Sequence, residues 1–149
     1  MDTAEARDRI EKWFPVLASS GYRITSPQDV NYNCIAWAAD DAERRWDTDE
    51  DYYWPDDVPR VDSVDALIKV YEGLGYAVCG NVDLESDYEK VAVYGDADGY
   101  THAAKQLPDG KWTSKLGDAE DIEHLTIDGL VGKDYGQVRC ILKRKRVRA

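Results

Sequence analysis

The sequence predicts an α+β domain in which N-terminal helices pack on one side of a C-terminal antiparallel β-meander. Two observations predict it. Apolar residues recur at helical spacing in the first half of the chain, and short strand-like stretches separated by turn sequences follow in the second half. The 149 residues are enough for one hydrophobic core, so we expect a single domain over 1–149.

The first and last predicted helices carry clear apolar faces. Residues 4–14 place Ile10, Trp13 and Phe14 on one face, and Pro15 should end this helix. Residues 63–75 predict a helix with Ser63 as its N-cap and Gly75 as its C-cap. Its apolar stripe consists of Leu67, Val70, Tyr71 and Leu74.

Between these helices the sequence predicts a loop, a second helix and another loop. Residues 19–33 have the composition of a loop. A helix is expected from Cys34 to about Arg45, with Asn33 as its N-cap. Residues 46–62 are acidic and aromatic, which predicts a loop whose aromatic rings pack against the rest of the molecule.

The second half predicts strands over 76–79, 90–95, 100–107, 111–116 and 136–144. Turn sequences at 95–99 and 108–110 join three of them into a meander over 90–116. A short helix is expected at 121–130.

Composition and charge exclude several classes of function. The net charge of −11 makes nucleic acid an unfavourable partner, and a basic protein partner fits better. No apolar run is long enough to span a membrane, and the acidic N-terminus lacks the features of a secretory signal, so we expect a cytoplasmic protein. The basic C-terminal end is expected to be solvated or to contact an acidic face of its own fold: Lys143, Arg144, Lys145, Arg146 and Arg148.

Cysteine and histidine usage argues against a metal site or a cofactor. The three cysteines are widely spaced without a C-x-x-C motif, and there are only two histidines. We therefore expect no metal, no cofactor and no disulfide framework.

Cys34 is the candidate nucleophile, because it opens the helix predicted after Asn33 and a helix N-terminus lowers the pKa of a thiol. An imidazole is the natural proton acceptor for such a thiol. His102 lies inside the predicted meander, and the face of its strand that includes Tyr100 and Ala104 would look onto the helix of Cys34.

An acyl-transfer site also needs hydrogen-bond donors for the oxyanion. Gln28 lies six residues before Cys34, and the backbone N–H of Cys34 would be the second donor. Asn31 and Asn33 are alternative donors, and Asn33 would also contact substrate. Trp46 and Trp54 in the acidic loop would line the substrate groove, although packing over the core is equally compatible with their size.

Each of these residues also has a purely structural interpretation. A free cysteine is often a small core residue, and His102 is then a strand histidine held by a neighbour. His124 lies near Asp121 and Glu123, so we expect it to have a structural role.

In this arrangement the chain resembles the papain-like thiol hydrolases, in which a cysteine opens a helix and a histidine follows on a strand. The interval from Gln28 to Cys34 is similar to that between the oxyanion glutamine and the cysteine of papain-type peptidases. The stretch "EKVAVYGDADGYTHAAKQ" resembles the hairpin of NlpC-type cell-wall peptidases. The chain also resembles an uncharacterised bacterial domain family marked by "YNCIAWA", "KVAVY", "THAAKQL" and "WTSKLG".

The chain departs from the NlpC-type pattern at one position. Lys90 stands where those peptidases have their catalytic histidine, and His102 matches the second, orienting position. The resemblance therefore implies that His102 is the base with Ser114 or Gln106 orienting it, that Lys90 has taken the partner or substrate-binding role, or that the site is inactive. We favour His102, because imidazole titrates near neutral pH and lysine does not.

The sequence thus predicts a cysteine-dependent amide hydrolase or acyl transferase, such as a peptidase, deamidase or transglutaminase-like enzyme, acting on a peptide or protein. The alternative is a non-catalytic binding module, such as an immunity or adaptor protein, on a degenerate papain-like scaffold.

Overall fold

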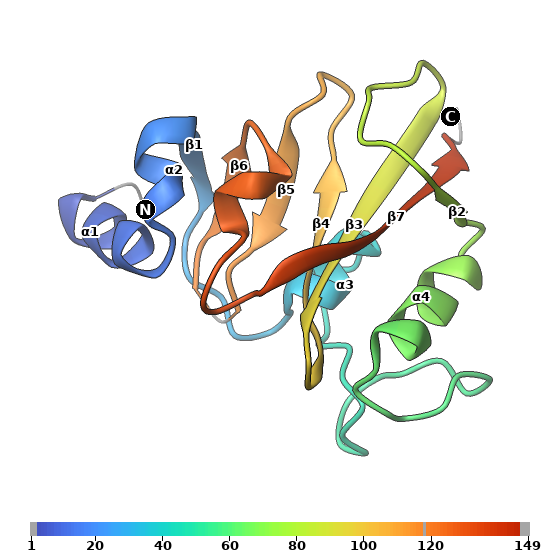
Figure 1. Ribbon diagram of the computed structural model, residues 1–149. Coiled ribbons are helices and arrows are strands. Elements are labelled where there is room, and N and C mark those ends of the chain that lie inside the picture. Colours follow the sequence, from blue (N-terminus) through green and yellow to red (C-terminus); the bar gives the residue numbers. More distant parts are fainter. Residues whose placement is uncertain (1–2, 118, 147–149) are drawn as a thin grey trace.

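The computed structural model describes residues 3–117 and 119–146 as helices packed on a seven-stranded antiparallel sheet (Figure 1). The helices are α1 (Ala4–Trp13), α2 (Pro15–Ser20), α3 (Cys34–Ala38), α4 (Val64–Glu72) and the 3₁₀-helix η1 (Ile127–Leu130). The strands are β1 (Tyr22–Ser26), β2 (Ala77–Cys79), β3 (Tyr88–Asp96), β4 (Gly99–Gln106), β5 (Trp112–Lys115), β6 (Asp121–His124) and β7 (Gln137–Lys145). The predicted α+β class is confirmed.

The strands of the sheet follow the order β1-β6-β5-β4-β3-β7-β2, so the predicted meander of β3, β4 and β5 lies in its middle. The connection from β3 to β4 is a hairpin with Val93 opposite Ala103 and Tyr94 opposite His102. A register shift between Tyr94 and Gly95 then sets Gly95 opposite Tyr100. Thr101 is thereby left unpaired, which changes the alternation of side chains along β4.

Helices cover both faces of the sheet, and not one face as expected. Ala103 packs with α3 and α4 in one core cluster, whereas Ala104 and Tyr94 pack with α1 and α2 in another. Since successive strand residues point to opposite faces, these two clusters are the two sides of the sheet. Figure 1 shows α1 and α2 beside β1, and α4 near β2 at the other end.

Local sequence explains the helix boundaries near the N-terminus. The Thr3 hydroxyl accepts a hydrogen bond from the Ala6 N–H and so caps α1. Pro15 ends α1 as predicted, and it opens α2, where a missing N–H costs nothing.

Two short strands were not predicted. The expected loop 19–33 contains β1, and the expected helix 121–130 begins as β6 before η1. The two strands pair with each other, with Ile24 opposite Ile122. Each strand is too short to show a strand pattern by itself, and their mutual pairing is a tertiary interaction.

The helix that begins at Cys34 is shorter than expected and ends at Ala38. Asp40 has φ 65°, which no helix can continue through. The cap of α4 at Ser63 is confirmed, because its hydroxyl accepts from the Ala66 N–H, but the C-cap is Gly73 and not Gly75.

The basic C-terminal strand contacts acidic residues of its own fold, as one of the two interpretations expected. Lys143 pairs with Glu85 at 2.8 Å, and Arg144 pairs with Glu89 and with Asp40. Arg148 lies outside the described residues. Within the described residues, none of the helices is both long and apolar enough to cross a membrane.

Candidate functional site

Cys34 is the first residue of α3, and its side chain is buried against β4. Asn33 caps this helix, since its Oδ1 accepts from the Ala36 N–H at 3.1 Å. Burial raises the pKa of the Cys34 thiol to about 11, and the backbone N–H groups of Ala103, Ile35 and Cys34 itself partly oppose this rise. The thiol is therefore protonated at neutral pH, and backbone donors surround the place where its charge would form.

His102 is fully buried on β4 and belongs to a chain of hydrogen bonds that leads away from Cys34. Its Nε2 lies 3.0 Å from the Ser114 Oγ, and this hydroxyl lies 2.8 Å from Nε2 of His124. The Nδ1 of His124 lies 2.8 Å from the carbonyl oxygen of Thr126. Ser114 is thus the neighbour of His102 that the resemblance implied.

The carbonyl at the end of this chain fixes the proton positions. A carbonyl only accepts, so Nδ1 of His124 carries the proton and its Nε2 is an acceptor. The Ser114 hydroxyl must then donate to His124 and accept from Nε2–H of His102. Nδ1 of His102 is left as a bare acceptor, and it is buried without a hydrogen-bond partner among the described residues.

Both imidazoles are neutral. Burial lowers the pKa of His102 well below its ordinary value, with a further contribution from His124. Burial lowers the pKa of His124 to about 4, against the effect of the Thr126 carbonyl. A neutral imidazole with a free lone pair is the form that acts as a base.

Cys34 and His102 are not hydrogen-bonded to each other within the described residues. The side chain of His102 contacts Tyr94, on the face with α1 and α2, whereas Cys34 packs with Ala103 on the opposite face. The expectation that the His102 face of β4 looks onto the Cys34 helix is therefore wrong. His102 shares the α1–α2 side with Ala104 by ordinary alternation, and the unpaired Thr101 turns only Tyr100 to the Cys34 side, where Ala103 also packs.

The sheet is open beside this part of β4. Among the described residues, β4 and β5 pair only as Lys105–Thr113 and Gln106–Trp112, so His102 and Ala103 lie beyond the end of the ladder. Tyr135 occupies this region, since the Thr101 hydroxyl donates to its carbonyl oxygen.

Tyr135 contacts the imidazole and lies near the thiol. Its ring stacks on His102 with centroids 4.2 Å apart and planes at 6°. Burial raises the pKa of Tyr135, and the charge of a Cys34 thiolate would add to the rise, so the two groups are within electrostatic reach. Tyr135 therefore covers one face of the His102 imidazole.

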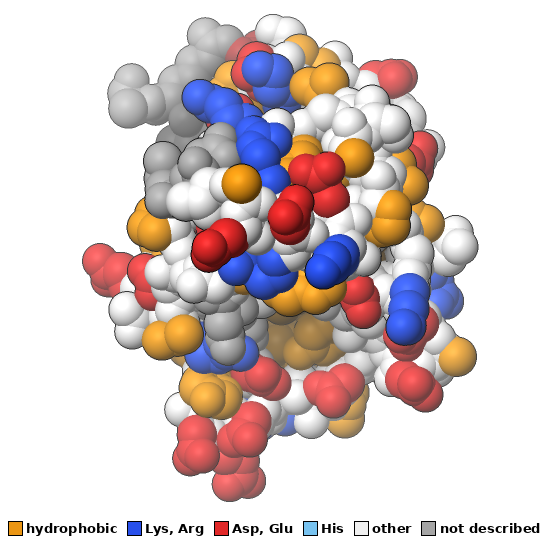
Figure 2. All heavy atoms as spheres, turned by 90° about the vertical axis from the view of Figure 1, so that its left-hand side faces the viewer, with side chains coloured by type: hydrophobic (Ala, Val, Ile, Leu, Met, Phe, Trp, Pro, Cys, Tyr) orange, Lys and Arg blue, Asp and Glu red, His pale blue; other side chains and the backbone are white. Residues whose placement is uncertain are grey.

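A hollow on the side of α1 and α2 reaches Tyr135. Figure 2 views this side and shows hydrophobic side chains at the back of a recess. A cavity of about 210 Å³ there is lined by Trp13, Phe14, Leu116, Gly117, Asp134 and Tyr135. The ring centroids of Phe14 and Tyr135 are 4.9 Å apart. The Tyr135 ring that stacks on His102 thus forms part of the wall of this hollow.

The other predicted site residues have different surroundings. Gln28 is exposed on the loop after β1. Asn33 and Trp46 are buried and tied together, because Asn33 Nδ2 donates to the Trp46 carbonyl at 2.8 Å and the Trp46 N–H donates back to Asn33 Oδ1. Asn33 thus serves as a cap and a loop anchor.

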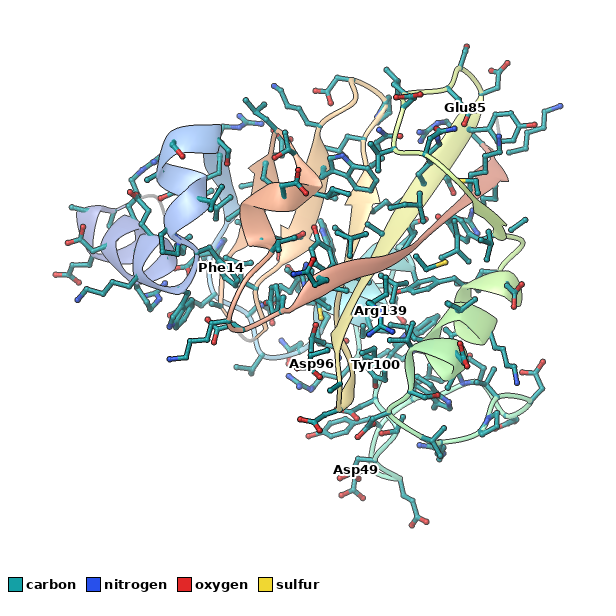
Figure 3. All side chains as sticks on the ribbon, in the orientation of Figure 1. Phe14, Asp49, Glu85, Asp96, Tyr100 and Arg139 are labelled. Carbon is teal, nitrogen blue, oxygen red and sulfur yellow. The ribbon has the colours of Figure 1, made fainter. Side chains whose placement is uncertain are left out.

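Trp54 and Lys90 are not placed to bind a substrate at this site. Trp54 is 1 % exposed and stacks on Tyr100 inside the core, so it presents almost no surface. Lys90 is fully buried, and its ammonium binds Glu85 at 2.7 Å and Asn81. Figure 3 shows Glu85 at the end of β3 opposite to the hairpin that carries Tyr100.

Sequence reasoning missed two residues of the site. His124 was expected to be structural, and the structure places it in the chain with Ser114 and His102. Tyr135 was not singled out, because its glycine-flanked stretch carries no chemical pattern. Among the described residues no three His, Cys, Asp or Glu side chains converge as metal ligands.

The comparison with protein families covers the cysteine, both histidines and Tyr135 of the site, but not α1 and α2. The family described as Domain of unknown function (DUF7689) matches residues 23–143. The chain belongs to this family. The searches of curated proteins and of solved structures each returned no match. The DUF7689 description assigns no activity.

Proposed function

We propose that the protein is a thiol-dependent acyl-transfer enzyme with a papain-like site, acting as an amide hydrolase or acyl transferase on a peptide or protein. Cys34 is the nucleophile, His102 the base, and Ser114 the residue that orients His102. The observation that carries the proposal is the buried Nδ1 of His102, which has a free lone pair and no partner among the described residues.

An unpartnered acceptor in a protein core is costly. Leaving a buried polar atom unsatisfied destabilises a fold by about 1–3 kcal/mol, and native structures retain few of them. Here the other nitrogen of the same ring is held by Ser114 at 3.0 Å, so the ring is fixed with its basic atom free. The free Nδ1 lone pair leaves His102 able to accept a proton, and this supports its role as the base.

The reaction follows from the proton positions. As the Cys34 sulfur forms a bond to the substrate carbonyl carbon, its proton moves to Nδ1 of His102. The backbone N–H groups at the start of α3 stabilise the oxyanion, with the exposed Gln28 as a second donor once substrate orders its loop. The imidazolium then protonates the leaving amine, and water or a second amine releases the acyl group from the sulfur.

The resting arrangement requires one movement before this step. Cys34 and His102 pack on opposite faces of the sheet and are separated by the strand that carries Ala103. In the proposal, a substrate that enters the hollow at Tyr135 displaces the Tyr135 ring from His102, the hydrogen bond to Ser114 opens, and the backbone of β4 rearranges at the unpaired Thr101 so that the imidazole reaches the sulfur. The high pKa of the thiol keeps it unreactive until then.

Acylation of Cys34 by an activated aryl ester tests the proposal. Intact-mass analysis after incubation should show an acyl group on Cys34 of the wild type, and not on Cys34→Ser. His102→Gln keeps a hydrogen-bonding group for Ser114 but removes the base, so its acylation should be slower by about a hundredfold or more. Equal acylation of the wild type and His102→Gln would remove the enzyme from consideration.

A second function is favoured by one observation. The thiol and both imidazoles are uncharged at neutral pH, so the resting site holds no thiolate–imidazolium pair. This state suits a non-catalytic module on a papain-like scaffold that binds a basic protein through its acidic surface. Calorimetry with a lysine-rich peptide tests it, because salt-sensitive binding that is the same in wild type and Cys34→Ser, without acylation, is expected only of a binding module.

A further inference from the structure

A buried carboxylate lies behind the segment that leads into α3. Asp121 on β6 is 1 % exposed, and its Oδ2 accepts hydrogen bonds from the hydroxyls of Tyr32, at 2.6 Å, and of Ser26. Its Oδ1 is buried without a hydrogen-bond partner among the described residues. Two hydroxyls from the loop before Cys34 therefore converge on one oxygen of a strand residue.

Tyr32 links Asp121 to the start of the helix that carries Cys34. It precedes Cys34 by two residues, it is buried, and its ring lies 5.5 Å from the ring of Trp37 within α3. The Trp37 indole donates to the Thr113 hydroxyl on β5 at 2.9 Å. The first turn of α3 is thus fastened to the sheet on both sides of Cys34.

The charges around Tyr32 reinforce this geometry. Lys115 lies opposite Asp121 in the register of β5 and β6, and its ammonium is 5.1 Å from the centre of the Tyr32 ring. A cation over the ring and a carboxylate at the hydroxyl both favour this one orientation of the phenol. Burial and the Asp121 carboxylate raise the pKa of Tyr32 to about 12, so it remains a donor at every physiological pH.

We propose that Asp121 is a positioning residue for Cys34: through Tyr32 it holds the backbone at the start of α3 so that its N–H groups face the sulfur and the oxyanion. This inference rests on the proposed acyl-transfer function. Among the described residues Asp121 is hydrogen-bonded to neither Cys34 nor His102, and it acts through the peptide segment 32–34.

Two substitutions separate positioning from stability. Asp121→Asn keeps the size and one acceptor but removes the charge, and Tyr32→Phe keeps the ring but removes the donor. Tyr22→Phe is the matched control, because it removes another tyrosine–carboxylate hydrogen bond, 2.7 Å to Glu11, on the α1 side of the fold. All variants are compared at a temperature below the unfolding transition of the least stable one.

Two constants of the aryl-ester reaction of Cys34 then distinguish positioning from stability: the maximal acylation rate and the ester concentration that gives half of this rate. Asp121→Asn and Tyr32→Phe should lower the maximal acylation rate about tenfold to a hundredfold with little change in the ester concentration for half-maximal rate, while Tyr22→Phe behaves as wild type. The pH midpoint for alkylation of Cys34 should also rise in the first two variants, because the backbone donors no longer face the sulfur. A merely structural role would lower stability and leave both readouts unchanged.

The outcomes distinguish this inference from the function on which it rests. Wild-type protein that acylates while both variants match it overturns the positioning role alone. Wild-type protein that shows no acylation of Cys34 overturns the function and the positioning role together. If Asp121→Asn does not fold, Tyr32→Phe decides the question, since it removes one hydroxyl from the same contact.

Discussion

The Ser114 hydroxyl joins His102 and His124, at 3.0 Å and 2.8 Å from their Nε2 atoms. The three side chains come from three adjacent strands, β4, β5 and β6, so the sheet itself sets their spacing. Because the chain ends on a backbone carbonyl at Thr126, its proton order is fixed in one direction. The consequence is a basic nitrogen on His102 that is held in the core and left free.

The two histidines should therefore be opposite tautomers. We expect His102 to carry its proton on Nε2 and His124 on Nδ1 at pH 7. Nitrogen-15 NMR of the rings distinguishes the two forms through their shifts and couplings. The same tautomer for both rings would contradict the proton order.

Removing the central hydroxyl should disrupt both histidines. Ser114→Ala leaves a buried donor on His102 and a buried acceptor on His124, so we expect a loss of about 2–4 kcal/mol in the free energy of unfolding. Thr113→Val is the control, since it removes a hydroxyl from the neighbouring residue on the other face, with an expected loss of about 1 kcal/mol. Urea unfolding measures both, and only Ser114→Ala should change the histidine NMR signals.

Stability should fall on mild acidification because the histidines are buried neutral. The folded pKa of His124, about 4, lies below its unfolded value of about 6.5, so between these values the unfolded state binds more protons. Lowering the pH from 7.5 to 5 should cost about 2 kcal/mol from His124, with a further loss in the same direction from His102. His124→Gln should remove its share of this dependence, which urea unfolding at both pH values would detect; an unchanged pH dependence would contradict burial in the neutral form.

Asn33 should stabilise two elements at once. Asn33→Ala loses the cap of α3 and both hydrogen bonds to the Trp46 backbone, with an expected loss of about 2–3 kcal/mol. Asn33→Ser retains a capping hydroxyl but cannot reach Trp46, so its loss should be about half as large. Thermal unfolding separates the variants, and equal losses would show that the hydrogen bonds to Trp46 alone matter and that the cap contributes nothing.

Much of the fold was predictable because its signals are local. The caps at Asn33 and Ser63, the break at Pro15 and the hairpin of β3 and β4 follow from neighbouring residues. The pairing of β1 with β6 was not predictable, since it joins segments far apart in the chain, and neither has a pattern of its own.

The candidate site was predicted in part for the same reason. Cys34 at a helix start and Ser114 beside His102 follow from spacing along the chain. The orientation of His102 did not, because the face of β4 that meets α3 is set by how the helices pack on the sheet and not by the alternation along one strand. His124 and Tyr135 join the site only through tertiary contacts with Ser114 and His102.

The central claim is that His102 removes the proton of Cys34. The most direct measurement is the pH dependence of Cys34 acylation by the activated aryl ester, measured by peptide mapping in wild type and in His102→Gln. If His102 is the base, the wild-type rate should be nearly constant from pH 6.5 to 8.5, whereas the rate of His102→Gln should rise about tenfold per pH unit towards the thiol pKa of about 11. Two profiles that rise together would show that His102 does not act on the thiol.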